Sequence, residues 1–255
     1  MVTYRSPREW ELMREAGRVV ARILAEGREA AVPGVVTAEL DALAGRILKE
    51  CGATSPFLHY KPVWAPFPYP ANICVSVNEV VVHGIPGRRV LEDGDLVTID
   101  AGAKLGGYCG DAAVSFVVGT QDAASTRLVE TTRRALENAI AAAVPGNRMG
   151  DVASAVERTA RDAGYGIADG SGGHGIGTEM HEDPPVPNTG RAGRGMPLRE
   201  GLTIAIEPLV TESGRDETWQ MPDGWAVATV DGSRAVHFEH TVAVTGDGPV
   251  VLTAP

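Results

Sequence analysis

Apolar residues recur at helical spacing through the first fifty residues of the chain. Residues 6–9 (Ser-Pro-Arg-Glu) have the pattern of a capping box with proline at the first helical position, and apolar residues follow every three or four positions. We predict a helix from about residue 7 to about residue 31, ended by Pro33-Gly34. A second helical pattern starts after Thr37 and stops at Gly52. The chain therefore begins with two helices joined by a turn.

The same order of patterns returns later. Helical spacing covers about residues 128–143 and 151–163, and the Val-Pro-Gly turn between them repeats the earlier one. Each helix pair is followed by an alternating segment that starts on a glycine and ends on a carboxylate, Asp100 in one copy and Glu207 in the other. We predict an α+β fold in one domain, built from two pseudo-symmetric helix-helix-sheet halves, about 1–120 and 121–255, around a central cleft.

Composition narrows the class of protein. A chain of 255 residues with 44% hydrophobic residues can bury a core, and its formal net charge of −10 disfavours nonspecific nucleic-acid binding. The N-terminus carries charges where a signal peptide needs an apolar run, and no apolar run is long enough to cross a membrane. We expect a cytoplasmic protein. Cys51, Cys74 and Cys109 lack a C-x-x-C spacing and are expected to be reduced.

Acidic residues stand at unusual places in the predicted strands. Asp100 and Asp111 belong to two strand-like segments joined by a short glycine turn, so a hairpin can bring both carboxylates together, as hard divalent cations favour. A single aspartate at a strand end is more often a turn residue. Glu207 and Glu239 also interrupt strand formers with no adjacent Lys or Arg, and burying them without a counter-charge is costly. Together the four carboxylates indicate a metal site.

His174 lies in a glycine-rich segment, residues 172–177, where the backbone can approach a ligand closely. A phosphate-binding loop is disfavoured because no Lys-Ser/Thr follows. The pair His181-Glu182 begins like a zinc-protease helix, but Pro185 occupies the place of the second histidine. No nucleophile elbow is present, so chemistry by a nucleophilic triad has no local support. Four carboxylates and one imidazole point instead to hydrolysis assisted by two divalent cations with a bridging water.

Several motifs combine in a way that resembles type I methionine aminopeptidases over nearly the whole chain. They are the segment 78–86 (NEVVVHGIP), the hairpin of Asp100 and Asp111, the segment 173–177 followed by His181, and the segments 206–208 (IEP) and 238–241 (FEHT). The resemblance implies the pita-bread (creatinase/aminopeptidase) fold, whose two halves agree with the repeat described above.

The resemblance also implies roles for individual residues. Asp100 would chelate one metal, His174 and Glu207 would hold the other, and Asp111 and Glu239 would bridge the pair. Glu207 would act as the proton shuttle and His181 would stabilise the oxyanion. His83 would contact the nitrogen side of the scissile amide. The two divalent ions could be cobalt, manganese, iron or zinc.

The implied activity is removal of the N-terminal initiator methionine from nascent polypeptides with a small second residue, by metal-activated water. The methionine pocket would be formed by aromatic and sulfur-containing side chains, namely Tyr60, Tyr69, Cys74, Met180 and Trp225. Residues 61–70 form an insertion at the pocket rim, where the family has a short turn, and could cover the cleft as a lip. We expect a monomer. The sequence does not decide whether it contacts the ribosome transiently. The alternatives are a noncatalytic pita-bread peptide-binding protein and another aminopeptidase of the same fold.

Overall fold

The computed structural model describes residues 1–170 and 172–254. Its helices are α1 (Pro7–Ala30), α2 (Thr37–Glu50), α3 (Ala123–Ala142) and α4 (Met149–Asp162). The first pair agrees closely with the predicted ranges. Helix α3 begins earlier than the apolar pattern suggests because the Asp122 carboxylate caps it, accepting hydrogen bonds from the backbone N–H groups of Ala124 and Ser125 at 2.8 and 2.9 Å.

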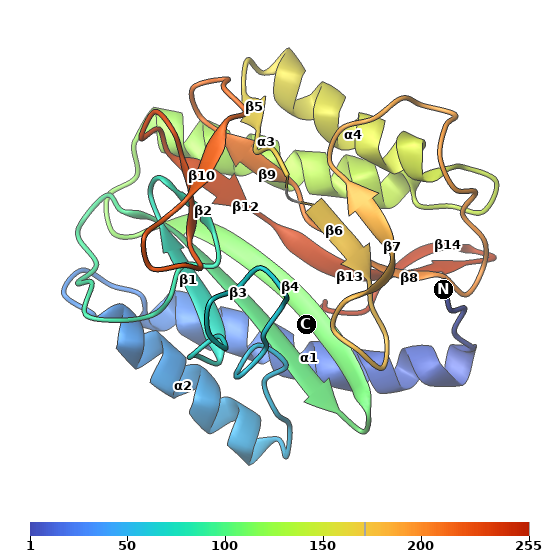
Figure 1. Ribbon diagram of the computed structural model, residues 1–255, viewed down its shortest axis with the longest axis horizontal. Helices are drawn as coiled ribbons and strands as arrows, with labels where there is room; N and C mark the ends of the chain where they lie inside the picture. The colour runs from blue at the N-terminus through green and yellow to red at the C-terminus, as the bar shows by residue number, and fades with distance from the viewer. Residues whose placement is uncertain (171, 255) are drawn as a thin grey trace.

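A curved antiparallel sheet forms the centre of the molecule (Figure 1). Its strands, in spatial order, are β1 (Ile73–Val77), β3 (Leu96–Leu105), β4 (Tyr108–Val117), β13 (Glu239–Thr245), β8 (Thr203–Ile206), β6 (Gly172–Gly175) and β7 (Glu182–Pro187), with β14 (Gly248–Val251) paired to β13. The first three strands come from the N-terminal half and the others from the C-terminal half. The two halves therefore join where β4 pairs with β13.

Two smaller sheets continue from the main one. They consist of β10 (Thr218–Gln220), β11 (Val227–Thr229) and β2 (Val80–Val82), and of β12 (Ala235–His237), β9 (Leu209–Thr211) and β5 (Gly166–Ile167). The strand-forming residues around Glu239 are thus divided at Phe238 between β12 and β13. Pro208 divides the neighbouring strands β8 and β9 at the same level, because it has no N–H to continue the ladder.

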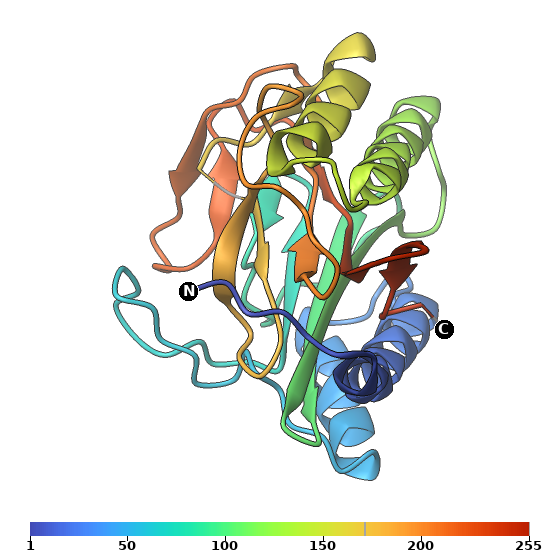
Figure 2. The ribbon, with the colours of Figure 1, turned by 90° about the vertical axis from the view of Figure 1, so that its right-hand side faces the viewer.

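Each helix pair covers its own part of the sheet. Figure 2 shows both pairs on one side of it. One hydrophobic cluster lies under α1 and α2 and includes Ile99 and Ala112, a second lies under α3 and α4, and Val114 packs against both. Since side chains alternate along a strand, Asp100 and Asp111 point away from the helices. The main sheet thus presents its carboxylates on the face opposite the helix layer.

Candidate metal centre and substrate pocket

Strand pairing places three of the predicted metal ligands side by side. Ala113 on β4 lies opposite Asp100 on β3 and opposite Glu239 on β13, so the three residues form one row across the sheet. Asp111 is two positions from Ala113 along β4 and therefore shares its face. The small side chain of Ala113 leaves space between the carboxylates. The junction of the two halves is thus also the floor of the candidate site.

His174 and Glu207 come from the C-terminal half. His174 on β6 pairs with Ala205 on β8, and Glu207 follows the last residue of β8. A Cβ added to Gly173 would lie 2.0 Å from the carbonyl oxygen of Ala205, so only glycine permits this approach of the two strands. Nδ1 of His174 lies 2.9 Å from the carbonyl oxygen of Gly175. A hydrogen bond there leaves Nε2 free to bind a metal.

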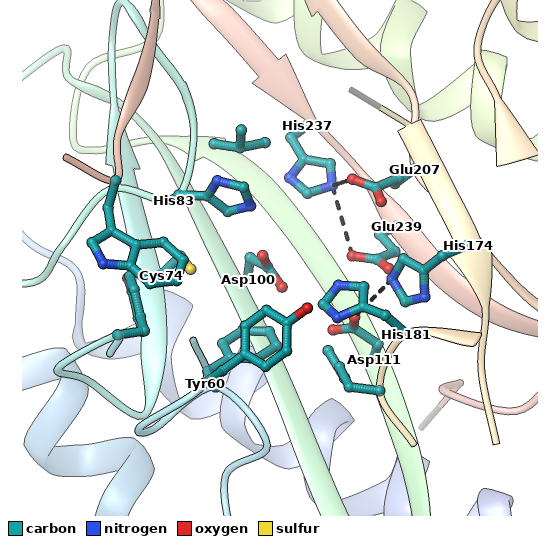
Figure 3. Close-up of a pocket in the computed structure, with 15 residues that line it drawn as sticks. Tyr60, Cys74, His83, Asp100, Asp111, His174, His181, Glu207, His237 and Glu239 are labelled. Atoms are coloured by element: carbon teal, nitrogen blue, oxygen red, sulfur yellow. Dashed lines mark ion pairs between the residues drawn. The ribbon is translucent and has the colours of Figure 1, made fainter. Parts of the chain in front are cut away.

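The ligand atoms converge on two overlapping groups (Figure 3). Asp111, His174 and Glu239 each offer a ligand atom within 4.8 Å of the others, and so do Glu207, His237 and Glu239. Nε2 of His174 is 3.6 Å from Oδ2 of Asp111. His237 was missed by the sequence analysis. His237 and Glu239 are two positions apart, but they belong to different strands, β12 and β13, so strand periodicity alone does not place them together.

The carboxylates are buried close together, so a bound cation would stabilise their charged forms. Burial raises the pKa of Asp111 to about 8 and that of Glu207 to about 8. Burial, and then repulsion from neighbouring carboxylates, raises the pKa of Glu239 and of Asp100 well above their usual values. One oxygen each of Asp100, Asp111 and Glu239 has no hydrogen-bond partner within the described residues. This donor set fits divalent cations.

Two further predicted histidines flank the carboxylates. His83 adopts a φ of 60°, a strained conformation for a residue with a side chain, and burial lowers the pKa of its imidazole to about 4. The His181 ring lies 4.3 Å from that of His174 and 5.0 Å from that of Tyr60. His181 is exposed at the pocket mouth, yet surrounding protein atoms and then His174 lower its pKa. Both imidazoles are therefore neutral near pH 7.

Apolar and sulfur-containing side chains line the rest of the pocket. Tyr69 donates its hydroxyl to the carbonyl oxygen of Gly84 at 3.0 Å and meets Trp225 edge to face at 4.9 Å. Trp225 Nε1 donates to the carbonyl oxygen of Phe67 at 3.1 Å. Every residue predicted for the site lines this one pocket, and the structure adds residues that the sequence did not single out, namely Phe57, Val82 and His237.

Comparison with known proteins identifies the family to which the chain belongs. The model of metallopeptidase family M24 matches residues 11–246. A methionine aminopeptidase of Mycobacterium tuberculosis is 49% identical over 99% of this chain and 95% of its own length. The chain belongs to the methionine aminopeptidases of family M24. Another member, from Bacillus subtilis, is 41% identical and covers 99% of both chains.

Solved structures confirm the fold of this family member. The methionine aminopeptidase of Thermotoga maritima superimposes with a TM-score of 0.95 at 41% identity and full coverage of both chains. The prolidase of Pyrococcus furiosus shares the fold alone, with a TM-score of 0.77 at 24% identity over 65% of its length. The predicted pita-bread fold and the predicted family are both confirmed. Within the described residues, none of the helices is long and apolar enough to span a membrane.

Proposed function

We propose that this metallopeptidase removes the N-terminal methionine from newly made polypeptides whose second residue is small, using two divalent cations. The observation that carries the proposal is one pocket with two chemically distinct ends. Four carboxylates converge at one end, and Tyr69, Cys74 and Trp225 enclose the other. A methionine side chain suits the enclosed end, because aromatic edges and sulfur favour a thioether.

The anionic end supports an aminopeptidase in particular. Asp100, Asp111, Glu207 and Glu239 would hold the metal ions, with His174 as a nitrogen ligand, and the free α-amine of a substrate would meet metal and carboxylate there. Bound divalent cations supply Lewis acidity that polarises the scissile carbonyl and lowers the pKa of water. The ions are cobalt, manganese, iron or zinc, all of which such ligands accept.

The chain's own side chains would complete the reaction. Glu207 would take a proton from the attacking water and pass it on. His181 stands at the mouth as a neutral donor for the oxyanion that develops on the carbonyl. His83, whose Nδ1 has no partner within the described residues, would contact the nitrogen side of the scissile amide.

A peptide assay tests the proposal. Chelator-treated protein given Co²⁺ or Mn²⁺ is expected to release methionine from Met-Ala-Ser, and to leave N-acetyl-Met-Ala-Ser and Leu-Ala-Ser uncut, as measured by mass spectrometry. Glu207→Gln should abolish release while circular dichroism shows an unchanged fold. Equal release from Leu-Ala-Ser would overturn the substrate, and metal binding without any release would favour the noncatalytic alternative.

The related prolidases define a second control. The Pyrococcus furiosus prolidase shares the fold at 24% identity. A Leu-Pro dipeptide should remain intact under conditions that release methionine from Met-Ala-Ser. Cleavage of Leu-Pro at a similar rate would assign the chain to another aminopeptidase activity on the same fold.

A further inference from the structure

His237 is a buried imidazole in the candidate site with no assigned role. Its side chain is 2% exposed, and Nε2 has no hydrogen-bond partner within the described residues. In Figure 3 the ring points between the carboxylates of Glu207 and Glu239. A buried polar nitrogen without a partner is rare and costly, so its position requires an explanation.

Contacts with two neighbouring strands hold the backbone of His237 in place. The Ser115 hydroxyl on β4 donates to the carbonyl oxygen of His237 at 2.7 Å and accepts from its N–H at 3.1 Å. On the other side, His237 pairs with Leu209 on β9. Contacts from two strands thus fix the backbone of His237 and the direction of its Cα–Cβ bond, as expected for a ligand whose geometry must be set in advance.

The distances around Nε2 fit a shared cation better than hydrogen bonds. Nε2 is 3.4 Å from Oε2 of Glu207 and 3.7 Å from Oε2 of Glu239, whereas an N–H···O hydrogen bond is usually about 2.9 Å. Ligand atoms bound tetrahedrally to one ion at about 2.1 Å stand about 3.4 Å apart. In the other group, Nε2 of His174 is 3.6 Å from Oδ2 of Asp111, a distance that also fits two ligands of one cation.

We propose that His237 is a sixth metal ligand, giving Nε2 to the cation that Glu207 and Glu239 hold. The centre then has one imidazole in each group of ligand atoms, His174 beside Asp111 and His237 beside Glu207, with Glu239 common to both, whereas the family resemblance puts His174 and Glu207 on one ion. This inference rests on the proposed metal centre and adds a nitrogen ligand to it. A second imidazole shifts the site's preference toward zinc and cobalt and away from manganese.

X-ray absorption spectroscopy of the wild-type protein tests the proposal without any substitution. Protein loaded with two equivalents of Zn²⁺ should show two imidazole ligands per pair of ions. One imidazole per pair would mean that His174 binds alone, and would overturn the assignment of His237. Failure to bind Zn²⁺ at all would overturn both this assignment and the proposed function, so the two failures are distinguishable.

A variant with a matched control measures how much His237 contributes to metal affinity. His237→Gln should weaken binding of the second Zn²⁺ at least tenfold by calorimetry, weaken Mn²⁺ less, and change the visible d–d absorption of bound Co²⁺. The control is His240→Gln on β13, whose Nδ1 lies 2.9 Å from Oγ1 of Thr253 outside this pocket. It should change none of these values.

The same variant separates a ligand from a residue that only orients Glu207. If His237→Gln folds, keeps both Zn²⁺ affinities and the Co²⁺ spectrum, and lowers only kcat, the ligand assignment is overturned. If the variant does not fold, as judged by circular dichroism, the imidazole count of the wild-type protein decides alone.

Discussion

The metal centre and the aromatic rim of the same pocket are built in opposite ways. Asp100, Asp111 and Glu239 stand on paired strands and Glu207 directly follows one, and the side chains of Asp111 and Glu239 are only 4% and 2% exposed. The rim is the loop of residues 57–70, where Trp64 is 53% and Phe67 39% exposed. Strand register therefore holds the reacting groups, whereas the rim is held by hydrogen bonds within its own loop, such as the one from the His59 N–H to the Tyr69 carbonyl, and by aromatic contacts. Changes at the centre should abolish the reaction, and changes at the rim should adjust its selectivity.

Glu239→Gln should have the largest effect, because Glu239 belongs to both groups of ligand atoms. We expect kcat/KM for Met-Ala-Ser to fall on the order of 10³-fold, the equivalent of several kcal/mol of transition-state stabilisation. Calorimetry should show fewer bound ions. Glu11→Gln, on the exposed surface of α1, is the control and should leave both values unchanged. Normal activity in Glu239→Gln would remove the distinction between centre and rim.

His181→Ala tests a residue that stands between the two regions. Loss of an oxyanion donor costs about 10²-fold in kcat, and we expect a fall of that size with unchanged metal content. His59→Asn is a suitable control, since His59 is exposed on the loop with φ 67° and asparagine tolerates this conformation. A fall in bound metal in His181→Ala would show that this histidine supports the centre and has no separate catalytic role.

The buried carboxylates also predict how the metal-free protein responds to pH. Their pKa values are raised, to about 8 for Asp111 and Glu207, so folding becomes less favourable as pH rises toward 8 and these groups must ionise. Neutral His83, with its pKa of about 4, acts in the opposite direction, but only below its unfolded pKa of about 6.5. The decisive window is therefore pH 6.5 to 8.5.

Across that window the metal-free protein should lose about 2 kcal/mol of stability for each of these two groups, visible as a fall of several degrees in Tm by calorimetry. Saturating Mn²⁺ should abolish the fall. Asp111→Asn should reduce the fall even without metal, because one ionising group is gone. A Tm of the metal-free protein that is constant between pH 6.5 and 8.5 would contradict the burial of the carboxylates.

The same contrast explains what the sequence could and could not predict. Helices α1 and α2 and the Asp100–Asp111 hairpin follow from local signals, namely a capping box, apolar spacing and a glycine turn. Metal-ligand candidates were recognisable because a carboxylate that ends a buried strand violates the usual pattern. His237 was not recognised, because a histidine among strand formers violates nothing. Its position depends on the division between β12 and β13 at Phe238, which lies level with the division between β8 and β9 at Pro208.

Trp64 should have the smallest effect of these residues and act on selectivity alone. Its ring stacks near His83 at 6.0 Å and meets Trp225 at 5.0 Å, beside the place proposed for the leaving side of the scissile bond. Trp64→Ala should raise kcat/KM for Met-Val-Ser relative to Met-Ala-Ser by about fivefold, mainly through KM, because a bulky second residue gains space. Val63→Ala, at a fully exposed neighbour, should leave the ratio unchanged. An unaltered ratio in Trp64→Ala would mean that the rim does not contact the second residue.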